Sequence, residues 1–374
     1  MGMWLAIFAI AIVLLIASLI YTINCFSRFW FVKRLAKDSK AKARITGLII
    51  TAVIAGGLTV TIGIVNMAIC LVHLLIFFGI ADIVTLIVRK VRKNEEKPKG
   101  FLGGYIALGI TVIYLIIGFY LANNVWQKDY KLKTSKQVEG LKIIQFADSH
   151  VGTTFDGEGL NKYIDMMNEQ QPDIVVITGD FVDDDTLKQD MLDACAAVGR
   201  LKTKYGVYYC FGNHDKGYYG DEHRGYSTDD LVAELEKNGV TVLEDESVLI
   251  DDSFYIIGRA DKSEELVGRG GGRKPVSDLT EGLDKSKYMI VLDHQPNDYN
   301  AEAAAGVDLV LSGHTHGGQM LPINPIGEWI GANDKTYGYE KRESTEFIVT
   351  SGISDWAIAF KTGCRSEYVI IEVN

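Results

Sequence analysis

Long apolar stretches fill the first third of the chain, and shorter ones alternate with polar residues in the rest. Residues 1–24 and 101–127 contain no charged side chain, and residues 45–88 contain only Asp82. A helix crosses a bilayer core with about 20 apolar residues, so the middle stretch has room for two crossings with a tight turn near residues 65–67. The pattern predicts four transmembrane helices, near 3–24, 45–64, 67–88 and 102–122.

Lys and Arg collect in the loops after the first and third predicted helices, at 28–44 and 89–99. Positively charged loops stay in the cytoplasm. We therefore expect a multi-pass protein of the cell membrane, with the N-terminus and everything after the fourth helix outside. A weaker basic cluster at 128–136 argues the other way. The first helix is a poor cleavable signal peptide, because its positive charges follow it.

Two ionisable side chains lie inside predicted spans and are functional candidates on that ground. For His73 we expect a neutral imidazole that is bonded within the helix bundle. Asp82 lies about two helical turns from Arg89 and is expected to pair with it. Neither is assigned a catalytic role.

Charge divides the chain into two parts. The net charge is −10, yet residues 1–127 hold 13 Lys and Arg against 4 Asp and Glu, which leaves 25 against 44 for residues 128–374. So acidic a second part argues against a nucleic-acid partner. Five cysteines without a CxxC pair predict free thiols rather than a disulfide framework or a zinc finger.

After a linker at 128–140, short β-branched runs alternate with helical segments. The runs are 141–147, 173–178, 207–211, 254–258, 288–292, 307–311, 347–350 and 368–373, and the helical segments are 158–170, 186–201, 228–238 and 298–305. This alternation predicts an α/β domain over 141–374 with buried, partly parallel sheets.

Asp, Asn and His follow five of these runs directly. The five ends carry Asp148 and His150; Asp180; Asn213, His214 and Asp215; His294; and His314 and His316. In open α/β sheets, ligands bind beyond the carboxyl ends of the strands. One such end could simply cap a helix, but five in order, with glycines at the turns, predict a metal site.

Carboxylate, imidazole and amide donors without thiolate favour divalent or trivalent Mn, Fe or Zn. Two such ions about 3.5–4 Å apart can clamp a phosphate and activate water at neutral pH. A ligand shared by both ions must be a carboxylate, since it needs two oxygen donors.

The series DxH, GD, GNHD, H and GHTH resembles the calcineurin-like metallophosphoesterases over residues 140–374. The sequence GHTHGGQ, residues 322–325 and the segments 350–352 and 363–365 are similar to the bacterial membrane-associated branch. The resemblance implies a four-layer (α-β-β-α) sandwich and a binuclear metal centre.

The resemblance also implies a role for each motif residue. Asp148, His150 and His316 would hold the first metal, Asn213, His294 and His314 the second, and Asp180 would bridge them. His214 would be a catalytic, non-ligand histidine that stabilises phosphoryl oxygens or protonates the leaving group, with Asp215 orienting it. Ser149 replaces a commonly apolar residue, which is expected to alter packing rather than ligation.

Three further features lie outside the five motifs. The segment Gly268–Lys274 is either a surface loop or a phosphate-binding loop that uses Arg269 or Arg273. His223 is either solvated or a substrate contact. Of the acidic residues after Asp180, Asp184 and Asp185 suit an exposed helix N-terminus, whereas Asp183 is a candidate to support His214.

These features favour a membrane-anchored enzyme that hydrolyses a phosphomonoester, phosphodiester or pyrophosphate bond. A site tethered at the bilayer favours a lipid-linked or envelope substrate. The alternative is a membrane sensor or transporter component whose domain binds metal or ligand without turnover. The complete motif set, His214 included, argues for the enzyme.

Overall fold

The computed structural model describes residues 2–93, 100–138, 140–266 and 271–374. The chain forms two compact units. The helical unit comprises Met1–Phe119 with Ala357–Ala359, and the sheet unit comprises Tyr120–Trp356 with Phe360–Asn374.

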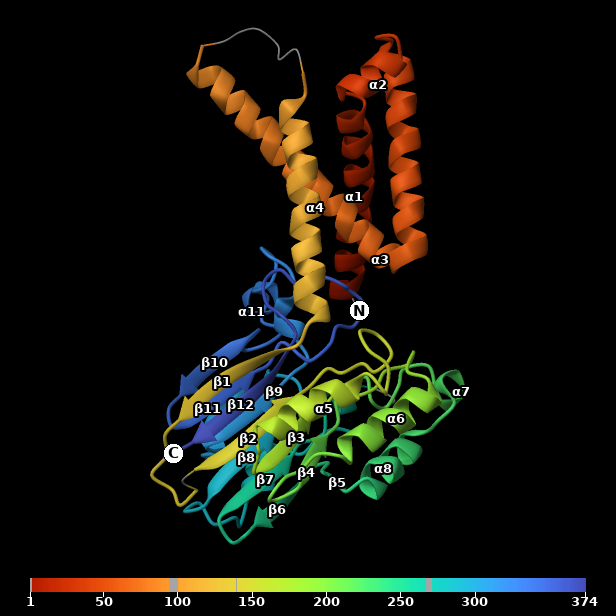
Figure 1. Cartoon of the computed structure of the whole chain (residues 1–374). Coiled ribbons are helices and arrows are strands. Elements are labelled where there is room, and N and C mark those ends of the chain that lie inside the picture. The colour runs from red at the N-terminus through yellow and green to blue at the C-terminus, as the bar shows by residue number, and fades with distance from the viewer. Residues whose placement is uncertain (1, 94–99, 139, 267–270) are drawn as a thin grey trace. The chain divides into compact units, whose positions relative to one another are not determined.

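The helical unit is built from α1 (Gly2–Phe26), α2 (Trp30–Leu35), α3 (Lys40–Val91) and most of α4 (Leu102–Asn123) (Figure 1). Within the described residues, α1, α3 and α4 are long and apolar enough to cross a membrane. Many of their large apolar side chains are exposed, among them Val53 and Val60. An apolar exterior suits lipid rather than water, so these helices indicate membrane association.

The long helix α3 replaces two of the four separate helices that the sequence predicted. Its 52 residues would span roughly 78 Å as a straight helix, more than twice a bilayer core of about 30 Å. Gly63 interrupts it with φ 80° and ψ 165°, and the chain changes direction there (Figure 1). Glycine takes positive φ at little cost because it has no Cβ. The expected turn at 65–67 is helical instead.

The structure pairs Asp82 with Arg28, not with the expected Arg89. The Arg28 guanidinium donates to both Asp82 oxygens, at 2.6 and 2.8 Å, and the Tyr21 hydroxyl donates to one of them at 2.7 Å. The bidentate pair links the turn after α1 to α3, and Tyr21 links α1 itself to the same carboxylate. His73 Nδ1 lies 2.8 Å from the Ile69 carbonyl oxygen, as a bonded imidazole should.

The sheet unit contains two six-stranded sheets (Figure 1). In order, the first sheet is β1 (Trp126–Leu132), β12 (Glu367–Val373), β2 (Leu141–Phe146), β3 (Ile174–Thr178), β4 (Val207–Cys210) and β5 (Val240–Val242). The second is β10 (Gly338–Arg342), β11 (Thr345–Val349), β9 (Leu309–Ser312), β8 (Tyr288–Leu292), β7 (Phe254–Gly258) and β6 (Glu246–Ile250). Strands β2–β5 are parallel, as are β7, β8, β9 and β11.

The two sheets and their helices make four layers. Val176 of β3 packs toward the second sheet with Ile256, whereas Val175 and Ile177 pack among the helices on the other face. Strands buried on both faces read as continuous apolar runs, which is why they were visible in the sequence. Helices α5 (Leu160–Glu169), α6 (Lys188–Val198) and α8 (Thr228–Lys237) cover the first sheet, and α9 (Val276–Thr280) and α10 (Tyr299–Ala305) cover the second.

The stretch expected to be a linker at 128–140 is partly a strand. Strand β1 begins at Trp126 and pairs in parallel with β12 at the edge of the first sheet. It starts three residues after the end of α4, and the last turn of α4 already belongs to the sheet unit. The membrane helix therefore leads directly into the first sheet.

Candidate metal centre

The motif residues sit in strained turns where the strands end. Five of them have positive φ: Asp148 54°, His150 37°, Asp180 51°, His314 71° and His316 47°. Positive φ is uncommon for residues other than glycine, and it clusters at functional sites. The parallel strands β2, β3, β4, β8 and β9 all end at this place.

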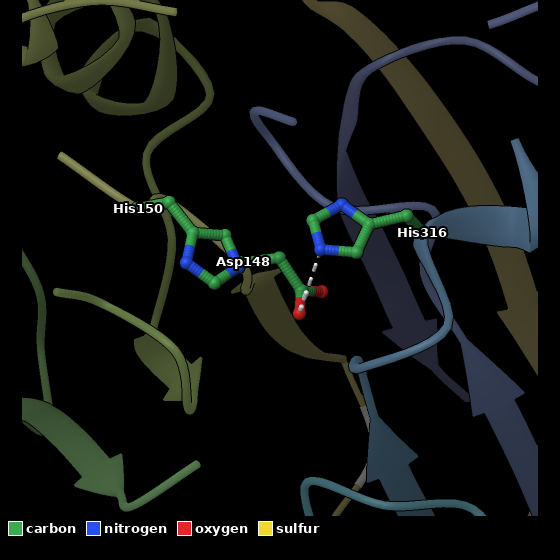
Figure 2. A group of neighbouring side chains, drawn as sticks. All are labelled: Asp148, His150 and His316. Atoms are coloured by element: carbon green, nitrogen blue, oxygen red, sulfur yellow. Dashed lines mark ion pairs between the residues drawn. The ribbon is translucent and has the colours of Figure 1, made fainter. Parts of the chain in front are cut away.

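Asp148, His150 and His316 form the first group of buried side chains (Figure 2). Their ligand atoms lie within 4.8 Å of one another. His316 Nε2 is 3.8 Å from an oxygen of Asp148, and the rings of His150 and His316 stack with centroids 5.2 Å apart. The turns that follow β2 and β9, far apart in sequence, thus deliver one set of donors.

Asp180, His294 and His314 form a second group with the same spacing. The Asn213 amide oxygen lies 2.8 Å from His314 Nδ1 and joins the group. His294 Nδ1 lies 2.8 Å from the Thr178 carbonyl oxygen. A carbonyl only accepts, so Nδ1 carries a proton and Nε2 is the nitrogen that faces the group.

The Asp180 carboxylate faces both groups. One of its oxygens is 3.7 Å from His150 Nε2 and 3.1 Å from His294 Nε2. Burial opposes its ionisation, but the charges of His294 and His150 outweigh burial and hold the pKa of Asp180 well below its ordinary value. An ionised carboxylate between two imidazole sets is the donor that two cations can share.

The donor set fits metal ions. The Nε2 atoms of His150 and His294 are buried near Asp180, but among the described residues neither makes a hydrogen bond of good geometry. Such an arrangement costs free energy unless a bound cation occupies the space that they face. Burial lowers the pKa of His314 to about 3 and holds that of His316 well below its ordinary value. Neutral imidazole is the ligating form, and these donors suit Mn, Fe or Zn.

His214 lies beside the two groups and belongs to neither among the described residues. Its ring is 5.2 Å from that of His150, 5.3 Å from Tyr218 and 4.9 Å from Trp356. Burial lowers the pKa of His214, although the Asp180 charge acts the other way. The position is that of a side chain that can reach a substrate held by the donor groups.

Asp215 holds the turn of Asp180 and does not contact the His214 ring in the described structure. Its carboxylate accepts hydrogen bonds from the backbone N–H groups of Gly212 at 2.6 Å, Asp180 at 2.8 Å, Phe181 at 2.8 Å and Val182 at 3.1 Å. Burial raises its pKa to about 6. Asp215 was expected to orient His214, whereas in the structure it supports the backbone around Asp180.

Asp183 supports a different histidine from the one expected. Its carboxylate lies 3.3 Å from Nδ1 of His150, which is a candidate metal ligand. Among the described residues, Asp183 makes no hydrogen bond to His214. His223 is half-exposed and lies 3.7 Å from Asp185, as a solvated residue would.

Arg273, a candidate for phosphate binding, is buried and donates to both oxygens of Asp293 at 2.9 Å. Arg269 and residues 268–270 lie outside the described residues. Ser149 is fully buried, with a hydroxyl that has no hydrogen-bond partner among the described residues.

Lys361 is a buried charge beside the centre that the sequence did not reveal. Its ammonium donates to the carbonyl oxygens of Ser351 at 2.8 Å and Ser354 at 3.0 Å, and to the Ser366 hydroxyl at 2.9 Å. It also lies 3.3 Å from Asp355. A single lysine between two glycine-containing segments belongs to no motif with a recognisable spacing. Its position beside the centre is therefore seen only in the folded structure.

Comparison with known proteins agrees with this geometry. The family model of the calcineurin-like phosphoesterases matches residues 141–318. An uncharacterised metallophosphoesterase of Bacillus subtilis is 31% identical over 220 residues, which cover 58% of this chain and 72% of that protein. A transmembrane protein with a metallophosphoesterase domain from Danio rerio is 27% identical over 312 residues, covering 79% and 69%. A solved dimetal phosphatase from Danio rerio is similar with a TM-score of 0.39 and 11% identity, covering 57% and 88%.

Two adjoining Asp/His groups at the strand ends of a double-sheet sandwich define a metal-dependent phosphoesterase. The chain belongs to the calcineurin-like metallophosphoesterase family, in a form that carries apolar, membrane-associating helices.

Proposed function

We propose that this protein is a multi-pass membrane hydrolase whose binuclear centre cleaves a phosphomonoester, phosphodiester or pyrophosphate bond in a lipid-linked or envelope substrate. The observation that carries the proposal is Asp180, whose carboxylate faces imidazoles of both donor groups. Asp148, His150 and His316 would hold one ion, and Asn213, His294 and His314 would hold the other, with the Asp180 carboxylate available to both.

When bound, two ions of Mn, Fe or Zn supply Lewis acidity and lower the pKa of water. The chain's own residues do the rest. Asp215 fixes the turn that carries Asp180, and Asp183 fixes the ring of His150. His214, beside the centre, stabilises phosphoryl oxygens or protonates the leaving group. Trp356 and Tyr218 flank its ring and restrict how it moves.

The test uses the full chain in detergent, loaded with manganese, against an aryl phosphomonoester, an aryl phosphodiester and a lipid pyrophosphate. We expect turnover of at least one class. H214A should lower turnover by about 10²–10⁴-fold, the usual contribution of such a group, with metal content unchanged. D180N should lose metal as well. No turnover with both metals bound would favour the sensor or transporter alternative.

The proposed topology depends on the break in α3. Residues 40–62 and 64–91 on either side of Gly63 each exceed the roughly 20 residues of one crossing, which gives four crossings with α1 and α4. With both basic loops in the cytoplasm, four crossings place the sheet unit outside. A reporter that is active only outside the cytoplasm, fused after Asn374, should be active. Activity of a cytoplasm-specific reporter there would overturn the placement.

A further inference from the structure

The chain exposes a row of large apolar side chains shortly after His316. Leu321 is 49% exposed, Ile323 55%, Ile326 50%, Trp329 73% and Ile330 54%. We call residues 321–330 the apolar segment; it includes the short helix α11 (Ile326–Trp329) (Figure 1). It holds five of the thirteen large apolar side chains that the described part of the sheet unit exposes. Such a concentration marks an interaction surface rather than ordinary scatter.

Polar groups, by contrast, fix the apolar segment to the domain. A carboxylate oxygen of Glu328 accepts the backbone N–H of Thr336 at 2.6 Å. The Gly327 carbonyl oxygen accepts from Ala332 N–H at 2.8 Å. Asn324 packs against Gly318 and Gly363 so closely that a Cβ on either glycine would meet it. The segment is thus ordered with its polar side chains inward and its apolar ones outward, the reverse of a surface built for water.

Residues 362–366 bind both the chain just before the apolar segment and the end of α4. The Gln319 carbonyl oxygen accepts from the backbone N–H groups of Thr362 at 2.8 Å and Gly363 at 2.9 Å. Three residues on, Ser366 donates through N–H to the Leu121 carbonyl oxygen at 3.0 Å and through its hydroxyl to that of Ala122 at 2.6 Å. All these contacts lie within the sheet unit.

Aromatic and basic side chains mark where α4 leaves the bilayer. The rings of Tyr120 and Trp126 lie 6.2 Å apart, and the Arg365 guanidinium lies 4.9 Å from the Trp126 ring. Tyr and Trp gather at membrane–water interfaces, where one end of the ring is apolar and the other is wet. With α4 crossing the membrane, such side chains suit a position of the stretch 362–366 at the level of the lipid headgroups.

We propose that the apolar segment inserts into the interface of the bilayer that anchors α4, with Trp329 and the neighbouring isoleucines among the upper acyl chains. The depth expected of such a contact is about 5–10 Å. Because Gln319 follows the ligand candidate His316 by three residues, the insertion holds the metal centre at the lipid surface. The proposal rests on membrane association and not on the reaction.

The test measures tryptophan fluorescence of the full chain in phosphatidylcholine vesicles, with the W329F signal subtracted to isolate Trp329. Vesicles whose acyl chains carry bromine should quench more than half of this component, and aqueous iodide should quench little of it. The matched control is L187W, because Leu187 lies in the sheet unit beside α6 and is 66% exposed. The added tryptophan should be quenched by iodide and spared by bromine.

Quenching of Trp329 by iodide to the extent of L187W overturns the proposal. Protection from both quenchers overturns it too, because protein then covers the segment. If that protection depends on the protein-to-lipid ratio, the cover is a second copy of the chain. I326W on the W329F background repeats the measurement one turn away, so the answer does not rest on one side chain.

Discussion

Lys361 and His316 share one acceptor, the carbonyl oxygen of Ser354, which lies 3.0 Å from the ammonium and 3.3 Å from Nδ1 of the imidazole. A carbonyl cannot donate, so the histidine must carry its proton on Nδ1 and present Nε2 to the first donor group. Partners of this kind fix the tautomer and orientation of a metal-binding histidine. The buried ammonium thus acts on the centre through one peptide group.

K361M should weaken metal binding at the first group. The loss of the ammonium frees the loop that carries Ser354 and leaves Asp355 buried without its cation. Changes to such supporting residues lower metal affinity by about 10–100-fold. Metal content after dialysis, measured by mass spectrometry, checks this. K202M, at an exposed position, is the control, and equal metal retention in both variants would contradict the role.

D215N should destabilise the turn that carries Asp180. Its carboxylate accepts four backbone N–H groups, and an amide offers only one oxygen for them. Each buried N–H left without an acceptor costs about 1–3 kcal/mol. The melting temperature and the metal content should fall together. Loss of turnover with both unchanged would instead assign Asp215 a direct catalytic task.

G212A should disturb the bridging position with little change in backbone preference, since φ at Gly212 is not positive. A Cβ there would lie 2.2 Å from a carboxylate oxygen of Asp180 and 2.4 Å from its backbone nitrogen. We expect loss of metal and of turnover. G109A in α4, where a Cβ meets nothing within 4 Å, is the matched control and should retain both.

E367Q should stabilise the protein at high pH only. Burial raises the pKa of Glu367 above its ordinary value of 4.5, so the folded state binds this proton more tightly than the unfolded chain. Ionising the buried Glu367 carboxyl therefore destabilises the folded state. This loss of stability is absent below the pKa that Glu367 has in the unfolded chain, and it is complete once the pH exceeds its pKa in the folded state. The melting temperature of E367Q minus wild type should rise from near zero at pH 4 to a positive value at pH 8. A difference independent of pH would contradict this; E246Q, at an exposed position, controls for the charge change.

The central strands were predictable because they are apolar throughout. Strand β3 (IVVIT) is buried along its whole length and reads as a strand without any context. The strands that the sequence missed are β1, β5, β6 and β10. Three of them, β1, β6 and β10, carry charged residues such as those of GYEKR in β10, and all four are edge strands. An edge strand pairs with one neighbour only. Its polar side chains obscure the alternation of apolar and polar residues by which a strand is recognised in a sequence.

The metal-binding candidates were predictable for a different reason. Each follows a buried strand, and parallel strands bring their carboxyl ends together whatever the loops between them do. Contacts that depend on loop geometry were not predictable. Asp183 was a candidate to support His214 and lies against His150. Asp82 was expected to pair with Arg89 and pairs with Arg28. Lys361 gave no signal because its acceptors are backbone carbonyls, which no sequence motif records.

The place of β12 also sets an order of events during synthesis. This strand, Glu367–Val373, lies between β1 and β2, the first two strands to be made. Until β12 is made, β1 has no partner strand and β2 has only β3, so each presents an open row of backbone donors and acceptors. The first sheet can therefore close only after translation of β12. On the proposed outward topology, that is also after nearly all of the sheet unit has crossed the membrane.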